Sequence, residues 1–100
     1  SAVLTVGDLT LDQDTREVRR GSQKITLSSR EFSLLRYMML NSGIVLSRST
    51  LEEHIWDFDY SGSSNVIDVY IRYLRRKIDD PYERKLIHTV RGMGYVLKEE

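Results

Sequence analysis

The sequence predicts an α+β fold in which a small antiparallel sheet is followed by three helices and a closing β-hairpin. Three observations support this prediction. Apolar and polar residues alternate over residues 3–27, apolar residues recur at helical spacing between residues 28 and 79, and two short apolar runs within residues 86–97 flank a glycine-rich turn. A chain of 100 residues suits one domain with one core, and no linker composition or internal repeat divides it.

The first part of the chain is expected to form short strands joined by turns. Residues 12–15 are a polar turn cluster, and Arg20-Gly21-Ser22-Gln23 predicts a hairpin turn. The apolar positions beside these turns are residues 3–6, Leu9, Leu11, Val18, Ile25 and Leu27. Their spacing predicts a small antiparallel sheet.

A capping box predicts where the first helix begins. Ser28 is followed three residues later by Glu31, the spacing at which each side chain caps the other residue's backbone N–H. Gly43 is expected to end this helix. The apolar stripe between these signals consists of Phe32, Leu34, Leu35, Met38 and Met39.

A second, short helix is expected to run from a Ser47 N-cap to about Trp56. Leu51 and Ile55 mark its buried face, whereas the two glutamates between them point away. The segment 57–63 that follows reads as a loop, because it contains two acids, two aromatic residues and a glycine.

The third helix, from about Asn65 to about Asp79, carries most of the functional prediction. At about 100° per residue, four aliphatic residues share one narrow face that must be buried: Ile67, Ile71, Leu74 and Ile78. The opposite side holds Asn65, Val69, Arg72 and Arg76, with Tyr73 at its edge.

This polar side of the third helix suits the major groove of DNA. Val69 would contact thymine methyl groups there, whereas by itself it would be an ordinary exposed apolar residue. Arg72 and Arg76 offer the planar fork of donors that phosphates and guanine edges accept. The alternative is a solvated helix face on which Asp68 pairs with Arg72 four residues later. Arg75 lies nearer the protein body and is expected to form a structural ion pair.

The charge distribution is more informative than the net charge. Fifteen basic and fifteen acidic residues leave a net charge of zero, which by itself argues against a nucleic-acid partner. Residues 31–64 hold two basic and five acidic residues, whereas residues 65–98 hold eight basic and four acidic residues. This asymmetry fits a phosphate-binding face within a neutral domain, and equally fits mixed charges that solvate helix surfaces.

The closing hairpin suits the minor groove. Gly92 and Gly94 permit the backbone angles of a tight turn, and Thr89 and Arg91 fall on one face of the preceding strand. A thin hairpin that carries an arginine fits a groove of negative potential. The alternative is an ordinary surface hairpin. His88 falls on the other face of this strand, where packing is its expected role.

Other classes of protein receive little support. The chain has no cysteine, its histidines (His54 and His88) lie in no ligand motif, and its acids match no calcium loop. Nothing pairs a nucleophile with a base, so we expect no enzyme, no metal and no cofactor. No membrane span or signal peptide is visible, which indicates a cytoplasmic protein. A protein-interaction module that never touches DNA remains an alternative, favoured by the zero net charge and the acidic, aromatic loop 57–63.

Long motifs in the chain resemble the OmpR/PhoB-type response regulators of bacteria. Residues 65–78 (NVIDVYIRYLRRKI) resemble the recognition helix of that family, and residues 86–95 (LIHTVRGMGY) resemble its wing. Segments 27–35, 45–48 and 55–56 also match. The resemblance implies a winged helix-turn-helix with a four-stranded N-terminal sheet, a three-helix bundle and a C-terminal hairpin wing. It identifies residues 1–100 as one effector domain of a two-component transcription factor, without the receiver domain on which a sensor kinase acts.

The resemblance also assigns roles by position. The places where the family touches DNA phosphates are occupied by Trp56, Asn65, Tyr70, Arg72 and Tyr95. Val69 and Tyr73 match positions that face bases, and Thr89 and Arg91 match wing positions at the minor groove. The loop 57–63 matches a segment that contacts RNA polymerase, with Asp57, Phe58, Asp59 and Tyr60 as its candidate contacts. Family members commonly bind direct repeats.

Some positions depart from the family pattern. Tyr73 stands where some relatives carry arginine, so a guanine contact cannot be assumed there. Asn65 and Tyr70 replace an arginine and a histidine, and both can still donate hydrogen bonds to phosphate. The operator sequence therefore cannot be borrowed from a relative.

Overall fold

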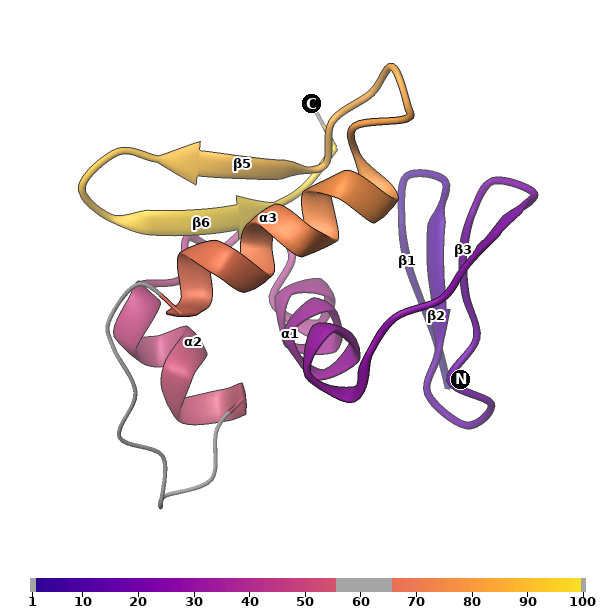
Figure 1. Ribbon diagram of the computed structural model, residues 1–100, viewed down its shortest axis with the longest axis horizontal. Helices are drawn as coiled ribbons and strands as arrows, with labels where there is room; N and C mark the ends of the chain where they lie inside the picture. Colours follow the sequence, from indigo (N-terminus) through magenta and orange to yellow (C-terminus); the bar gives the residue numbers. More distant parts are fainter. Residues whose placement is uncertain (1, 56–65, 100) are drawn as a thin grey trace.

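The computed structural model describes residues 2–55 and 66–99, with the side chain of Ile55 left out. A four-stranded sheet comes first, three helices follow, and a two-stranded hairpin closes the chain (Figure 1). The elements are β1 (Val3–Val6), β2 (Leu9–Asp12), β3 (Val18–Arg20), β4 (Gln23–Ile25), α1 (Ser29–Leu40), α2 (Arg48–Ile55), α3 (Val66–Ile78), β5 (Ile87–Val90) and β6 (Gly94–Leu97). The predicted α+β architecture is confirmed, including the four-stranded N-terminal sheet.

The N-terminal sheet is an antiparallel meander in the order β1-β2-β3-β4. Leu11 lies opposite Val18 and Val18 lies opposite Ile25, so the predicted alternation places apolar side chains on the face that packs against the helices. Leu27 follows β4 instead of belonging to it and is half-buried. Arg20 lies opposite Leu9 and is equally buried, although it is charged.

The capping box of α1 forms as its sequence predicts. The Ser28 hydroxyl accepts the Glu31 N–H at 3.2 Å, and the Glu31 carboxylate accepts the Ser28 N–H at 2.9 Å. The helix ends at Leu40, earlier than Gly43, and Asn41 caps it. Gly43 has a φ of 83° and donates its backbone N–H to Leu97, so this glycine turns the chain towards the final hairpin.

Helices α2 and α3 also follow their sequence signals. The Ser47 hydroxyl accepts the Thr50 N–H at 3.2 Å, which confirms Ser47 as the N-cap of α2. Helix α3 ends at Ile78, one residue before the predicted end, and Asn65, where the predicted span begins, lies outside the described residues. Its buried residues are Ile67, Ile71, Leu74 and Ile78, and the predicted stripe is confirmed.

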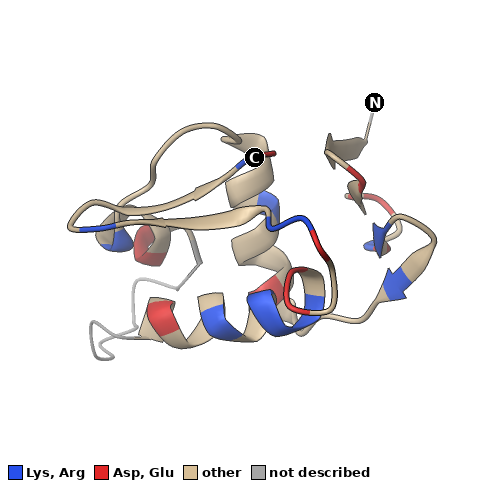
Figure 2. Ribbon diagram, turned by 90° about the horizontal axis from the view of Figure 1, so that it is seen from above, with Lys and Arg blue, Asp and Glu red and all other residues tan. Residues whose placement is uncertain are grey.

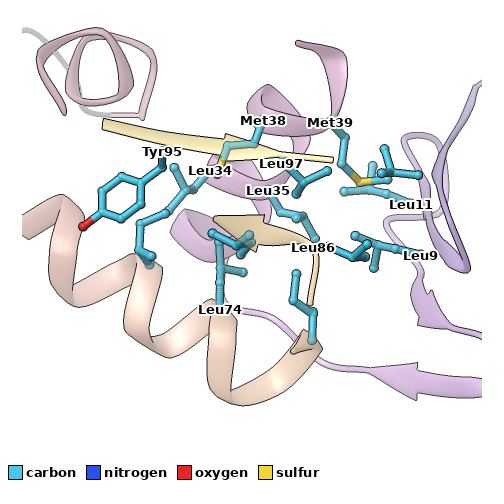
Figure 3. Close-up of a cluster of buried hydrophobic side chains, with 14 of the residues drawn as sticks. Leu9, Leu11, Leu34, Leu35, Met38, Met39, Leu74, Leu86, Tyr95 and Leu97 are labelled. Carbon is cyan, nitrogen blue, oxygen red and sulfur yellow. The ribbon is translucent and has the colours of Figure 1, made fainter. Parts of the chain in front are cut away.

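One hydrophobic core joins all these elements. The side chains in Figure 3 come from β2, from α1, from α3 and from the C-terminal hairpin, and they meet between the sheet and the hairpin. At the edge of this core, Lys77 of α3 donates to Glu31 of α1 at 2.7 Å. Burial acts to raise the pKa of Glu31, but the bonds from Lys77 and Ser28 outweigh it and lower the pKa. The core and this salt bridge hold one side of α3 against α1, and the opposite side of α3 stays exposed.

Candidate nucleic-acid interface

Basic residues recur along α3 (Figure 2), and several of them lie on its exposed side. Arg72 and Arg76 lie one turn apart on it and are exposed, and Tyr73 between them is 39% exposed. Val69 is half-buried one turn before Tyr73. The four residues of the predicted groove face thus lie together along α3, opposite the buried stripe.

The arginines of this face are not used to hold the fold. Within residues 2–55 and 66–99, the side chains of Arg72 and Arg76 form neither a hydrogen bond nor a salt bridge. The same holds for Arg91, which lies exposed at the turn of the hairpin. Arg72 and Arg76 are like charges four residues apart on one helix, a spacing that destabilises the helix slightly through repulsion. An anionic partner would remove that cost.

Asp68 has different partners from the one that helical spacing predicts. Its Oδ1 accepts from Arg48 Nε at 2.7 Å and from the hydroxyl of Tyr95, whereas Arg72 influences it only through its charge. Partial burial acts to raise the pKa of Asp68, but the hydrogen bonds from Tyr95 and Arg48 outweigh it and lower the pKa. Instead of the Asp68–Arg72 pair of the alternative interpretation, Asp68 forms contacts to α2 and to the hairpin, and within the described residues the Arg72 side chain forms no salt bridge.

Arg75 has the structural role expected of it, but not through an ion pair. Its Nη2 donates to the Thr89 hydroxyl at 2.6 Å and lies 3.4 Å from the Ile87 carbonyl oxygen, both on β5. Its guanidinium group also lies over the ring of Tyr95, 5.7 Å from the centroid. Among the described residues no acidic side chain pairs with Arg75, and the hairpin supplies neutral acceptors and an aromatic face instead. Arg75 thus ties the hairpin to α3.

The hairpin is attached to the start of α2 as well. Leu46 and Tyr95 exchange backbone hydrogen bonds of 2.8 and 2.9 Å, which adds an isolated bridge beside β6. This approach leaves no room for a side chain at position 94. A Cβ built on Gly94, whose φ is 142°, would lie 2.8 Å from the Leu46 carbonyl carbon and closer still to its oxygen. A glycine in the wing motif is thus explained by a close backbone contact.

The other predicted contacts divide into three groups. Thr89 and Arg91 lie on the exposed hairpin, where they were expected. Tyr70 packs against the core and its ring meets that of Tyr73 edge-to-face, with centroids 5.7 Å apart. Tyr95 is only 5% exposed, and its ring is directed from β6 towards α3 (Figure 3). Outside the described residues lie Trp56, Asn65, Asp57, Phe58, Asp59 and Tyr60.

Sequence reasoning missed a buried polar cluster at the far end of α3. Arg20 donates to Asp8 at 2.5 Å, to Arg84 O at 2.6 Å and to the carbonyl of Ile78, and it lies 3.4 Å from Asp79. Asp79 in turn accepts the backbone N–H groups of Leu86 and Ile87, each at 3.0 Å. The sequence contained a signal for this cluster. Strand alternation places Arg20 on the same face as the buried Val18, and a charged residue on a buried face requires polar partners.

The histidines have local roles. The ring of His54 stacks on that of Tyr37 with centroids 4.1 Å apart, and its Nδ1 lies 2.8 Å from the Thr50 carbonyl oxygen. His88 is half-buried, with Nε2 3.2 Å from the Lys98 carbonyl oxygen. Among the described residues, no three histidine, aspartate or glutamate side chains gather into a possible metal site. No described helix is both long and apolar enough to cross a membrane.

Comparison with known proteins identifies the family. Residues 22–97 match the model of the family described as transcriptional regulatory protein, C terminal. The chain belongs to this family. It is 53% identical over 95% of its length to the transcriptional regulatory protein YkoG of Bacillus subtilis, and covers 42% of that protein. It is 52% identical over 97% of its length to the probable transcriptional regulatory protein TcrX of Mycobacterium tuberculosis, and covers 41% of it.

Solved structures agree with this assignment. The response regulator DrrB, an OmpR/PhoB homologue of Thermotoga maritima, superimposes with a TM-score of 0.86 at 31% identity, over 98% of this chain and 45% of that one. The DNA-binding domain of Klebsiella pneumoniae RstA, solved in complex with the RstA box, gives a TM-score of 0.85 at 30% identity over 98% of both chains. The resemblance to OmpR/PhoB-type regulators and the winged helix-turn-helix fold are confirmed. Members of this family are transcriptional regulators, not enzymes.

Proposed function

We propose that this domain binds double-stranded DNA sequence-specifically, as the effector part of a two-component response regulator, and thereby regulates transcription. The observation that carries the proposal is the placement of Arg72, Arg76 and Arg91. All three are exposed and none forms a salt bridge within the described chain; two lie on α3 and one at the turn of the β5–β6 wing. The RstA domain, which has the same fold, was solved in complex with its DNA box.

Helix α3 is the element we assign to the major groove, which admits an α-helix. Val69, Tyr73 and Arg76 would face the bases, with Val69 suited to thymine methyl groups. The phosphates on either side would be contacted by Trp56, Asn65, Tyr70 and Arg72. At the remaining phosphate position of the family pattern, Tyr95 already donates its hydroxyl proton to Asp68. The Ile67–Ile78 stripe packs this helix on the core, which supports the proposal because groove contacts require a rigidly held helix.

The wing is the element we assign to the minor groove. Arg91 at its turn would enter the groove, where negative potential attracts a guanidinium group. Thr89 lies two residues earlier, and its hydroxyl accepts from Arg75. A threonine hydroxyl that accepts one bond keeps its own proton to donate, so Thr89 can still reach a phosphate or a base edge.

The partners of the longer protein follow from the family. The chain spans about two fifths of the length of the curated relatives it matches, at 42% of the first of them. This supports the proposal that a receiver domain, phosphorylated by a sensor kinase, regulates the domain in the cytoplasm. Direct-repeat sites and an RNA polymerase contact through Asp57–Tyr60 are further parts of the proposal.

The salt dependence of DNA binding tests the helix assignment. Arg72→Ala should lower the slope of log K against log salt by about 1, because one phosphate contact and its released counterions are lost. Arg84→Ala is the matched control, since Arg84 is also exposed but lies in the loop after α3. An unchanged slope for Arg72→Ala would remove Arg72 from the interface. Absence of any binding to genomic fragments at low salt would favour a protein-interaction module instead.

The wing assignment has its own test. Arg91→Ala should weaken binding by about 1–3 kcal/mol if Arg91 reads bases or groove width. Selection of bound sequences from genomic fragments supplies the operator for this measurement. Wild-type affinity of the variant for that operator would exclude the minor-groove role.

A further inference from the structure

Three elements meet at Arg48, the first residue of α2. Two residues earlier, Leu46 is held to Tyr95 of the wing by the paired backbone hydrogen bonds. The Arg48 side chain is held to Asp68 of α3 by the bond from Nε, and its guanidinium group lies 5.4 Å from the centre of the Tyr95 ring. The position of Arg48 is therefore fixed relative to α3 and the wing together, although its side chain is 43% exposed.

The donor capacity of Arg48 is far from exhausted by this arrangement. A guanidinium group carries five N–H donors in a planar fork. The bond to Asp68 uses the Nε–H, and the Tyr95 hydroxyl oxygen is a second partner, so further N–H donors of the fork are left for other acceptors. A permanent charge with spare, pre-oriented donors is the group that a DNA phosphate accepts most readily.

Tyr95, in contrast to Arg48, has no hydrogen-bond donor to spare. Its single hydroxyl proton is donated to the Asp68 carboxylate, so it has none to offer a phosphate while that bond persists. Asp68 is held in its charged, accepting form, because the bonds from Tyr95 and Arg48 outweigh desolvation and lower its pKa. Of these two side chains, only Arg48 therefore has hydrogen-bond donors available for a phosphate.

Arg72 connects this cluster to the proposed interface. Arg48 is bonded to Asp68 at 2.7 Å, and Arg72 follows Asp68 by four residues on α3, a spacing at which helix side chains are surface neighbours, so Arg48 and Arg72 flank the same carboxylate. Arg72 is the α3 residue proposed to contact a phosphate, and it is exposed one turn after Asp68. A DNA backbone that reaches Arg72 therefore passes near Arg48.

We propose that Arg48 is a further DNA-backbone contact of this domain, with Asp68 and Tyr95 as the positioning residues that hold its guanidinium group towards the phosphate. This inference rests on the proposed DNA-binding function. It assigns to α2 a direct role in binding, in addition to its place in the helical bundle.

Salt-dependent binding of paired variants tests Arg48 without leaving an unpaired charge. The comparison is between Asp68→Asn and the double variant Arg48→Gln/Asp68→Asn, which differ only at position 48. If Arg48 contacts a phosphate, the double variant should bind more weakly than Asp68→Asn, and its salt slope should be smaller by about 1. If Arg48 only neutralises Asp68, the two variants should bind alike with equal slopes, and the proposal is overturned.

If the double variant unfolds at too low a temperature for binding measurements, Arg48→Lys provides a second test of the contact. Lysine retains the charge and can still pair with Asp68, so the variant should keep the wild-type salt slope at an unchanged melting temperature. A slope lowered by about 1 in this variant would contradict a charge-dependent backbone contact. Circular dichroism melting of each variant accompanies the binding measurements.

Arg72→Ala separates the two proposals. If Arg72→Ala lowers the slope while position 48 has no effect in the Asp68→Asn background, only the Arg48 contact is wrong. If the wild type shows no salt-dependent binding to DNA fragments, the proposed function fails as well.

Discussion

Two arginine–aspartate pairs hold α3, one near each end, and they differ mainly in burial. At the C-terminal end, Arg20 and Asp79 are both 2% exposed in their side chains. At the N-terminal end, the side chains of Arg48 and Asp68 are 43% and 35% exposed. Removing one partner from a buried pair leaves a desolvated charge, whereas an exposed pair is screened by water. The same chemistry thus stabilises the fold at one end of the helix and is accessible to a ligand at the other.

The buried end links three parts of the chain that are distant in sequence. Arg20 comes from the N-terminal sheet, and its guanidinium group lies over the ring of Tyr82 at 4.8 Å. Asp79 accepts the backbone N–H groups that begin the wing. Lys85 donates to the carbonyl oxygens of Asp79 and Tyr82 at 2.9 and 2.7 Å. The cluster therefore fixes the direction in which the chain leaves α3 for the wing.

The largest expected effect is at this buried end. Asp79→Ala should destabilise the domain by about 3–5 kcal/mol, because it leaves two backbone N–H groups without their acceptor and the buried Arg20 without its buried countercharge. Urea unfolding measures the change. Asp80→Ala is the matched control, since Asp80 is adjacent but exposed, and its effect should stay within about 0.5 kcal/mol. Equal stabilities for the two variants would mean that the burial of Asp79 does not make this carboxylate more important to the fold than its exposed neighbour.

Gly94 tests the attachment of the wing to α2 at the other end. Gly94→Ala should cost about 1–3 kcal/mol for the backbone angle and a similar amount for the clash with Leu46. Gly92→Ala is the control, because Gly92 has a φ of 76° but open space around its Cβ position, so only the first cost applies. Thermal unfolding should therefore rank Gly94→Ala well below Gly92→Ala. The reverse order would show that the Leu46–Tyr95 bridge contributes little.

The smallest expected effect is the acid dependence of the exposed pair. The folded pKa of Asp68 is lowered, so its contribution to stability is present above the unfolded pKa of about 3.9 and is lost as the pH falls through the folded value. At pH 7, Asp68→Asn should cost about 0.2–1 kcal/mol, as expected for a solvent-screened pair. The difference from wild type should shrink below about pH 4. A difference that persists at pH 2 would indicate a role for Asp68 other than charge.

Local patterns predicted the elements and one face of α3 well. The helical spacing of Ile67, Ile71, Leu74 and Ile78 requires only periodicity, and all four are buried. The caps at Ser28 and Ser47 also form, because a cap depends on residues three positions apart. Such signals are contained in short windows of sequence.

The partners of charged residues could not be predicted in the same way. Asp68 bonds to Arg48 and Tyr95, which lie 20 and 27 positions away, instead of to Arg72 on its own helix. Arg20 reaches Asp79 across 59 positions. These contacts depend on how the elements pack in three dimensions, which periodicity does not encode. Only the resemblance to a known family pointed to Tyr95, and it gave no indication of the acceptor for its hydroxyl.

The Leu46–Tyr95 bridge has a consequence for domain engineering. Because β6 is bonded to the segment that leads into α2, the wing and the first turn of α2 form one rigid unit on which the start of α3 rests. A recognition helix transplanted from another regulator must therefore bring a carboxylate at position 68, or it will lose the bonds from Arg48 and Tyr95 and keep at most the contacts of residue 75 with the wing. Grafts that exchange residues 66–78 alone should be chosen by that criterion before they are chosen by the bases they read.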